Sequence, residues 1–573
     1  MQQTQNRGDV LRSVLPYLAA RVIIAAGCLA SWGALSAEEP PREIVDRPSS
    51  RELEKPSYLP PQPAEEFQLP PVEERELSPG VRGQTLAVKG FVFEGNKAIP
   101  SDDLQRVAAP FAARNISSAE LEELRQNLSR YYIERGYINS GALLNPGFYQ
   151  DGTVHFRIVE GRVENVRFTG MGRLRESYVR DRLIRPDEPL DVNVLQERFQ
   201  LLLTDPLFAK VNARLQPGTG PGRATLDVEV TRARPYNLSI FADNYRSPSI
   251  GAEALGLAGR VRNLTGLGDV VDATVQGGRE RNERVSLRWA VPIIDIRTLM
   301  QARYDHGRSS VLEEPLDALD IKSVLDSREI GISRTLVKTI RRQFSLGITY
   351  THRENATELL GEPFSFVPGE PTGTSKVSAW RFDQEFVQRW EKQVLALRSI
   401  FTSGRTNTIA TEGNPNITPQ KHYFFWIGQT QFTRRVMDNG SDVLLRANVQ
   451  WSQDRLVPLE RFAIGGVTTV RGYRENQLVR DQGFNATVEF RYPLLDRPAA
   501  PHRLILIPFV DYGEAWNKGE KRDALAAIGL GLNYQFRGFS AELYVAKRLI
   551  EPEAETSGDL QDHGVHFQLR YDL

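Results

Sequence analysis

The sequence predicts a transmembrane β-barrel of about 16 antiparallel strands, preceded by two small α+β domains. From about residue 235 to the C-terminus, apolar and polar residues alternate in about sixteen stretches separated by turn residues. Roughly 340 residues shared among sixteen strands leaves about 21 for each strand and its connection, as tilted membrane strands of about ten residues require. Upstream, a β-α-α-β-β pattern occurs twice, and the chain opens with a secretory leader.

The leader is predicted over residues 1–37. Three arginines precede the apolar stretch 22–37, which ends in small residues, so we expect a signal peptide cleaved after Ala37. The single cysteine, Cys28, completes "AAGC", which resembles a lipoprotein cleavage box, but Ala25 stands where a larger aliphatic residue is usual. We therefore expect Cys28 to leave with the signal. A mature chain without thiols suits an oxidising compartment.

Residues 38–84 form a predicted linker. They are rich in proline, glutamate and arginine and poor in apolar residues, a composition typical of an extended, poorly ordered spacer. The prolines between residues 39 and 71 leave at most a short helical turn at 49–55.

The first small domain is predicted over residues 85–161. It opens with an alternating strand, which a short helix from Ser101 follows. Ser117 and Glu120 form a capping box that begins a longer helix. One face of this helix carries an apolar stripe, which consists of Leu121, Leu124, Leu128 and Tyr131. A hairpin with the turn Asp151–Gly152 completes the unit.

The second small domain is predicted over residues 162–233 and repeats the same order of strand, two helices and hairpin. Its second helix places three apolar residues on one face, namely Leu195, Phe199 and Leu202. Both units carry a Phe-x-Gly sequence after the first strand, at 93–95 and 168–170. The shared order and the shared turn indicate a tandem module.

The barrel is predicted over residues 234–573. No run of about 18 apolar residues predicts a spanning helix. A soluble sandwich or propeller is the alternative, but blade-like repeats are absent and the leader favours a membrane barrel. Apolar residues alternate on the last strand, at Phe567, Leu569, Tyr571 and Leu573. A closed barrel satisfies every backbone group in lipid, which an open sheet cannot do.

One polar stretch interrupts the strand pattern, at residues 454–483. It lies between the predicted eleventh strand, 444–452, and twelfth strand, 485–493, and is therefore the sixth external loop. Its apolar residues need a surface to pack on: Phe462, Ile464, Val467 and Val470. Three glycines permit tight turns there, Gly465, Gly466 and Gly472. We expect the loop to fold back into the lumen.

The loop arginine Arg471 is expected to seek an acidic partner on the inner wall. On the predicted thirteenth strand, Phe509, Asp511 and Gly513 share one face. If that face is the inner one, an Arg471–Asp511 pair would pin the loop by a charge-assisted, bidentate bond. The alternative interpretation is that Arg471 is one more solvated charge in the lumen or on the surface.

Four stretches resemble the two-partner secretion transporters, the TpsB group related to haemolysin secretion/activation proteins. They are "VRGYRENQLVRDQGF" (470–484), "FVDYG" (509–513), "DNYRSPSIG" (243–251) and "NLTGLGDVVDATV" (263–275). The plan of signal, linker, two polypeptide-transport-associated (POTRA) domains and C-terminal barrel is also similar to that family. The resemblance covers about residues 85 to 573 and implies a sixteen-stranded pore that exports one cognate protein across the outer membrane.

The resemblance also implies a lock between the loop and the barrel wall. The family's loop arginine and strand aspartate correspond to Arg471 and Asp511. The implied lock consists of Val470, Arg471, Gly472, Tyr473, Phe509, Asp511 and Gly513. Two features depart from the family pattern: the prolines of the linker argue against an N-terminal plug helix, and the chain ends in Leu573 where such barrels commonly end in Phe.

The expected partners follow from the same resemblance. They are a cognate secreted TpsA-type protein that is unfolded in the periplasm, outer-membrane lipid, and the barrel-assembly machinery that inserts the barrel; we expect a monomer. A factor that assembles other membrane proteins is the alternative function, although such relatives usually carry more POTRA units. With 72 basic and 72 acidic residues, the balanced charge gives no reason to expect a nucleic-acid partner.

No enzyme site, metal site or cofactor is predicted. The seven histidines are scattered and no two have the spacing of metal ligands. Neither a G-x-S-x-G elbow nor a P-loop occurs. An outer-membrane lipase or protease, the alternative from another class, would not explain two periplasmic modules. We therefore expect binding and passage of a client rather than catalysis.

Overall fold

The computed structural model describes residues 67–68, 85–186, 188–408, 418–496, 502–552 and 558–573. The predicted signal peptide and nearly all of the predicted linker lie outside the described residues. Among the helices of these ranges, none is long and apolar enough to cross a membrane.

The first unit is a small sheet with two α-helices packed on it. Its elements are β2 (Thr85–Val88), β3 (Gly90–Glu94), α2 (Ser101–Ala108), η1 (Ala109–Phe111), β4 (Arg114–Ser117), α3 (Ser118–Ile133), β5 (Gly141–Leu143), β6 (Tyr149–Gln150) and β7 (Thr153–Val159). Strand β7 pairs in parallel with β3 and antiparallel with β5 and β6, while β2 pairs with β4. Leu104, Leu124 and Phe156 lie at the centre of the core between the sheet and the helices.

Helix α3 begins as the sequence predicts. The Ser117 hydroxyl accepts a hydrogen bond from the Glu120 amide at 3.2 Å, and the Ser117 amide donates to the Glu120 carboxylate at 2.7 Å. The three leucines of the predicted stripe are buried. The fourth predicted member, Tyr131, is half-buried and packs against the same core, and the Arg135 guanidinium lies 3.3 Å from the centre of its ring. Its neighbour Tyr132, which the sequence analysis did not name, is fully buried.

The second unit repeats this plan. Its elements are β8 (Arg162–Thr169), α4 (Glu176–Leu183), α5 (Val192–Leu203), β9 (Phe208–Pro217) and β10 (Arg223–Arg232). Strand β10 is central, antiparallel to β9 and parallel to β8, and the predicted apolar face of α5 is buried. One short piece of the predicted linker is a strand rather than free spacer, because β1 (Phe67–Gln68) pairs in parallel with β9.

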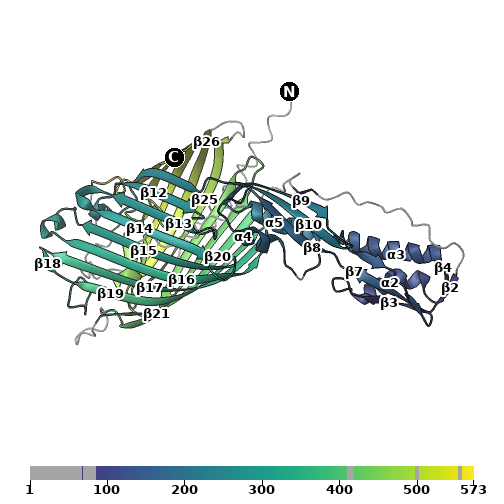
Figure 1. Ribbon diagram of the computed structural model, residues 1–573. Coiled ribbons are helices and arrows are strands. Elements are labelled where there is room, and N and C mark those ends of the chain that lie inside the picture. Colours follow the sequence, from purple (N-terminus) through teal and green to yellow (C-terminus); the bar gives the residue numbers. More distant parts are fainter. Residues whose placement is uncertain (1–66, 69–84, 187, 409–417, 497–501, 553–557) are drawn as a thin grey trace, which may run out of the picture. The chain divides into compact units, whose positions relative to one another are not determined.

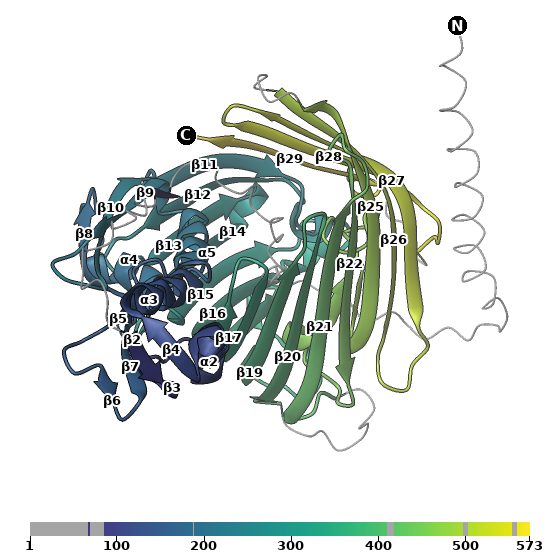
Figure 2. The same ribbon diagram turned by 90° about the vertical axis from the view of Figure 1, so that its right-hand side faces the viewer.

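Sixteen antiparallel strands form a closed barrel, and Figures 1 and 2 show them following one another around the wall. They are β11 (Tyr236–Asp243), β12 (Ala254–Arg262), β13 (Val270–Gly277), β14 (Glu283–Pro292), β15 (Thr298–Ser310), β16 (Lys322–Lys338), β17 (Arg342–Leu359), β19 (Thr374–Arg389), β20 (Gln393–Thr406), β21 (His422–Arg435), β22 (Asp442–Ser452), β25 (Gln482–Asp496), β26 (His502–Trp516), β27 (Asp523–Phe536), β28 (Phe539–Arg548) and β29 (Val565–Asp572). The last strand pairs with the first, so the barrel has no open edge.

The connections between the barrel strands contain short helical turns and short strands. They are η2 (Pro248–Ile250), η3 (Arg279–Arg281), η4 (Leu316–Leu319), β18 (Glu362–Pro363), η5 (Pro458–Glu460), β23 (Phe462–Ile464) and β24 (Leu478–Arg480). The strand number agrees with the prediction, but the strand length does not, since β17 has 18 residues. About ten tilted residues cross the apolar part of a bilayer, so strands of this length extend beyond it.

Candidate functional site: the resident loop and the inner wall

Residues 453–481 connect the eleventh strand, β22, to the twelfth, β25, and are called the resident loop below. The loop starts and ends within two residues of the predicted limits. It contains η5 and a short hairpin of β23 with β24. Ile464, Val470 and Tyr473 are fully buried, so the loop packs against a surface.

That surface is the inner face of the barrel wall. On β26, Val510 and Tyr512 are 41% and 37% exposed, whereas Phe509 and Asp511 are buried. Because successive side chains of a strand point to opposite faces, the buried pair lies inside. The loop's buried apolar residues form one cluster with inward residues of β26, β27 and β28, several of which are alanines. Small wall residues leave the room that the loop fills.

Arg471 and Asp511 lie together at the centre of this contact. Arg471 Nε donates to Asp511 Oδ2 and Nη2 donates to Oδ1, each at 2.8 Å. The Arg471 backbone amide adds a third bond to Oδ2 at 3.0 Å. Both side chains are almost without solvent exposure, 3% and 0%. The sequence-based alternative of a solvated arginine does not describe this geometry.

Arg471 has further partners that the sequence analysis missed. Its Nη1 donates to Glu489 Oε1 on β25 at 2.9 Å, and its guanidinium lies 3.5 Å from the centre of the Phe509 ring. Burial opposes the charge, but the hydrogen bonds and the charge of Asp511 outweigh it and raise the pKa of Arg471 above its ordinary value. The guanidinium is therefore permanently charged where it binds.

The other predicted lock residues surround this pair. Val470 lies in the apolar cluster, and the Tyr473 hydroxyl lies 2.6 Å from the Ile550 carbonyl and 2.9 Å from that of Ala526. Gly472 has φ +92°, and a Cβ there would lie 2.9 Å from the Ala546 Cβ, so only glycine allows this approach. On the wall, Gly513 leaves space for Ile464, whose Cδ1 would lie 3.2 Å from an added Cβ.

A second anchor holds the start of the resident loop. Glu460 in η5 is buried, and both of its carboxylate oxygens accept from Arg381 Nη2 on β19, at 2.7 and 2.9 Å. Arg353 on β17 lies 3.5 Å from the same carboxylate. Here the loop supplies the acid and the wall supplies the bases, the reverse of the Arg471 contact. The loop is thus tied by charge to two separate parts of the wall.

A third contact joins the loop to neighbouring connections. Arg474 donates to Asp562, between β28 and β29, at 2.7 Å, and to Glu313, between β15 and β16, also at 2.7 Å. The Glu475 amide donates to the Gln561 side-chain oxygen at 2.9 Å. These bonds link three connections at the same end of the barrel.

Sequence reasoning could have found one of the missed partners. Glu489 belongs to an inward polar series on β25, together with Asn485, Thr487 and Arg491, and its alternation is visible in the sequence. His566, whose Nε2 accepts from the Gly472 amide at 3.2 Å, gives no such signal. Its position depends on how β29 closes the barrel.

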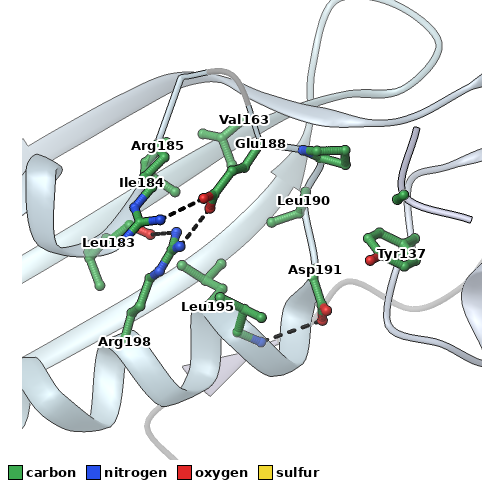
Figure 3. Close-up of a pocket in the computed structure, with 13 residues that line it drawn as sticks. Tyr137, Val163, Leu183, Ile184, Arg185, Glu188, Leu190, Asp191, Leu195 and Arg198 are labelled. Carbon is green, nitrogen blue, oxygen red and sulfur yellow. Dashed lines mark hydrogen bonds and ion pairs between the residues drawn. The ribbon is translucent and has the colours of Figure 1, made fainter. Parts of the chain in front are cut away.

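A pocket of about 350 Å³ borders the second unit (Figure 3). There Glu188 accepts from Arg198 at 2.6 Å and from Arg185 at 2.8 Å, and the Arg198 guanidinium contributes most to holding the pKa of Glu188 below its usual range. Asp191 caps the first turn of α5 by accepting from the Asn193 amide at 2.8 Å. Since these charges satisfy one another or a helix end, the pocket presents no reactive group.

No group of three or more histidine, cysteine, aspartate or glutamate side chains that could hold a metal ion occurs among the residues that the structure describes. The arrangement at the resident loop is a set of ion pairs and packing contacts. These contacts attach a polypeptide segment to the inner face of the barrel wall.

Comparison with known families supports the assignment of a POTRA domain followed by a transport barrel. The family model described as "Haemolysin secretion/activation protein ShlB/FhaC/HecB" matches residues 222–534, more than half of the chain. The model described as "POTRA domain, ShlB-type" matches residues 86–161. The first match includes both sides of the Arg471–Asp511 contact.

Several transporters are similar along most of their length. The heme/hemopexin transporter protein HuxB of Haemophilus influenzae (strain 86-028NP) is 20% identical, over 79% of this chain and 82% of that protein. The outer membrane transporter CdiB of Escherichia coli is 22% identical, over 74% and 72%. The hemolysin transporter protein HpmB of Proteus mirabilis is 22% identical, over 81% and 82%.

Solved structures show the same fold. CdiB from Escherichia coli superposes with a TM-score of 0.68 at 20% identity, covering 87% of this chain and 92% of that one. CdiB from Acinetobacter baumannii gives 0.61 at 16% identity, covering 86% and 91%.

Proposed function

Because this chain belongs to the haemolysin secretion/activation protein family ShlB/FhaC/HecB, we propose that the resident loop closes its pore at rest and that Arg471 and Asp511 hold it there. The protein is an outer-membrane β-barrel transporter of two-partner secretion, with POTRA domains in the periplasm.

The observation that carries the proposal is the loop's attachment from inside the barrel. A loop with an apolar tip and a buried bidentate ion pair occupies lumen space that an exported chain would need. Ion pairs suit a reversible attachment because water or charged groups of a client can replace each partner once the contact opens.

The client is a cognate secreted protein of the TpsA type, unfolded in the periplasm and bound at a POTRA sheet edge. In the first unit, the Ala142 amide on the edge strand β5 donates to Ser129 Oγ on α3 at 3.0 Å rather than to another strand. The Ala142 carbonyl accepts from Arg125 Nη1 at 3.3 Å. A client strand can exchange these side-chain partners for main-chain ones, which gives affinity, while its alternate side chains give specificity.

Passage requires no catalysis by this chain. Folding of the client outside the cell supplies the direction of transport. The barrel works as a monomer in outer-membrane lipid, after insertion by the barrel-assembly machinery. The alternative, a factor that assembles other membrane proteins, loses support because the matching family is one of secretion proteins.

Chemical labelling of single cysteines tests the proposal. The only native cysteine, Cys28, lies in the predicted signal, so an introduced thiol has no native competitor after cleavage. Val470→Cys is expected to resist a water-soluble maleimide at rest, because residue 470 is fully buried, and to react during export of a client. Leu360→Cys, at a position 64% exposed, is the control that reacts in both states. Equal labelling of Val470→Cys with and without client would refute the proposed displacement of the resident loop during export.

A further inference from the structure

His566 is a titratable side chain that the resident loop covers. It is fully buried on β29, and its Nε2 accepts a hydrogen bond from the Gly472 amide of the loop at 3.2 Å. An imidazole nitrogen accepts only when it carries no proton, so the ring that holds the loop is neutral and its single proton lies on Nδ1. The loop backbone is therefore bound to a type of side chain whose charge changes near neutral pH in water.

Two arginines hold positive charge beside this ring. Arg548 Nε donates to the Gly472 carbonyl at 2.6 Å, so Arg548 and His566 bind the carbonyl and the amide of the same residue. The charges that act on the imidazole are those of Arg471 and Arg548. A proton on Nε2 would put a third positive charge there and would direct an N–H at the Gly472 N–H. Protonation would thus break the hydrogen bond to the loop.

Burial makes the charged ring still less favourable. Nδ1 of His566 is already buried without a hydrogen-bond partner among the described residues. Protonation of Nε2 would add a second unmet N–H donor, and both an unmet donor and an unpaired charge are costly away from water.

Carboxylates of the surrounding loop segments are engaged elsewhere. Asp511 and Asp562 bind the loop arginines, Arg471 and Arg474. Glu475 of the loop accepts from a backbone amide of the same loop at 2.8 Å. None of these three carboxylates is left without a partner to bind a protonated imidazole.

The strands that flank β29 place tyrosines at the level of His566. Tyr544 lies directly across on β28, and the register of β11 continues to Tyr245 on the other side. Neither phenol carries charge at neutral or mildly acidic pH. The inward carboxylates of these strands, Asp243 and Glu542, lie across from the next inward position of β29. The neutral ring is thus the form that fits the docked loop.

Docking of the loop and protonation of His566 therefore exclude each other. When the loop undocks, the imidazole meets water, where the ordinary pKa of such a ring is about 6.5. Protonation then stabilises the undocked loop, so the docked loop keeps its full stability above about pH 6.5 and loses it as the pH falls below that value. For a ring that stays neutral in the docked state, the ratio of undocked to docked loop rises about tenfold between about pH 8 and about pH 5.5.

We propose that His566 is a pH-sensitive latch, which holds the resident loop on the wall when it is neutral and releases the loop when it is protonated. The opening of the pore by this release rests on the function proposed above, whereas the release itself does not.

Cysteine labelling at residue 470 measures docking whether or not the loop closes the pore. In the full-length protein, we would compare the rate at which a water-soluble maleimide labels Val470→Cys with its rate at the exposed control Leu360→Cys, at about pH 8 and about pH 5.5. The ratio of the two rates cancels the pH dependence of the thiol reaction. It is expected to rise about tenfold at the lower pH. An unchanged ratio would overturn the proposal.

Two substitutions at residue 566, each combined with Val470→Cys, separate charge from shape. His566→Gln offers an oxygen that accepts from the Gly472 amide and does not titrate, so the ratio should stay low at both pH values. His566→Lys carries a charge at both, so the ratio should be high already at about pH 8. His563→Gln, the same change at an exposed position three residues away, is the control that should keep the tenfold rise.

The variants overturn the latch in either of two ways. A ratio that still rises at low pH in His566→Gln would show that another group titrates, and equal ratios for His566→Gln and His566→Lys would show that the charge of residue 566 does not matter. Heat-modifiable gel migration verifies that each barrel is folded. Single-channel open probability is recorded over the same pH range. A labelling ratio that rises without any change in open probability would confirm the latch and refute the proposed closure of the pore by the loop.

Discussion

Replacing Arg471 by alanine should raise the fraction of undocked resident loop far more than replacing Asp511 by alanine. Arg471→Ala leaves the fully buried Asp511 carboxylate without its cation, whereas Glu489 keeps Arg491 at 3.0 Å. Asp511→Ala leaves an arginine that still has Glu489 and the face of the Phe509 ring. Breaking a buried ion pair by deleting one partner costs about 3–5 kcal/mol. We expect the free-energy cost of Arg471→Ala at the upper end of that range and the cost of Asp511→Ala at or below its lower end.

These free energies translate into a measurable change of gating. A shift of about 3–5 kcal/mol in the equilibrium between a docked and an undocked loop changes the ratio of undocked to docked loop by roughly 150-fold to 4,000-fold. Single-channel recording in planar bilayers measures the undocked fraction as open probability. Secretion of the client is measured in parallel at equal barrel abundance.

The double variant decides whether the two residues act as a unit. Once Arg471 is gone, deleting Asp511 removes an unpaired buried charge, so Arg471→Ala/Asp511→Ala should be no worse than Arg471→Ala alone. Arg471→Lys should keep only part of the wild-type attachment of the loop, because an ammonium cannot make the two parallel hydrogen bonds of the guanidinium. Additive effects of the two single changes on open probability would refute the reasoning.

Three further predictions follow from the same structure. Deleting residues 85–161 while the barrel still assembles should abolish export, because the sheet edge that binds the client is lost. Normal secretion from this variant would show that the client does not need that edge. Glu460→Leu should free the start of the loop, because it removes the carboxylate that Arg381 binds at 2.7 Å, while Arg353 keeps Glu329. We expect the open probability to rise at least about tenfold, and an unchanged open probability would show that this anchor does not hold the loop. Hydrogen bonds from the Ser117 amide and hydroxyl, followed by that from Arg114, lower the pKa of Glu120 from 4.5 to about 2. The stabilisation that ionised Glu120 gives α3 is therefore present above pH 4.5 and is lost as the pH falls toward 2. Hydrogen exchange of the α3 amides should show this pH dependence, and Glu120→Gln should abolish it.

The sequence predicts much of the fold because period-two alternation is a local signal. Counting alternating stretches places the resident loop after the eleventh strand and Asp511 on the thirteenth, where the structure has both. The capping box of α3 is equally local, since Ser117 and Glu120 lie three residues apart.

Contacts between distant strands could not be predicted in this way. Glu460 finds Arg381 and Arg353 only because the loop bends toward β17 and β19, and no local pattern encodes that bend. The pairing of β1 with β9 is set by a free sheet edge rather than by the composition of the linker. Both Tyr131 and Tyr132 pack against the core of the first unit, and the deeper burial of Tyr132 depends on the shape of that core rather than on the spacing of the stripe.

The conductance of a barrel that lacks the resident loop tests the central claim most directly. Deleting residues 458–478 removes the loop's anchors and its buried tip while leaving β22 and β25 joined. If the loop closes the pore at rest, single channels of this variant should be open continuously, with a larger conductance than the wild type. A conductance and open probability equal to those of the wild type would contradict the account, because the lumen would then be closed by something else.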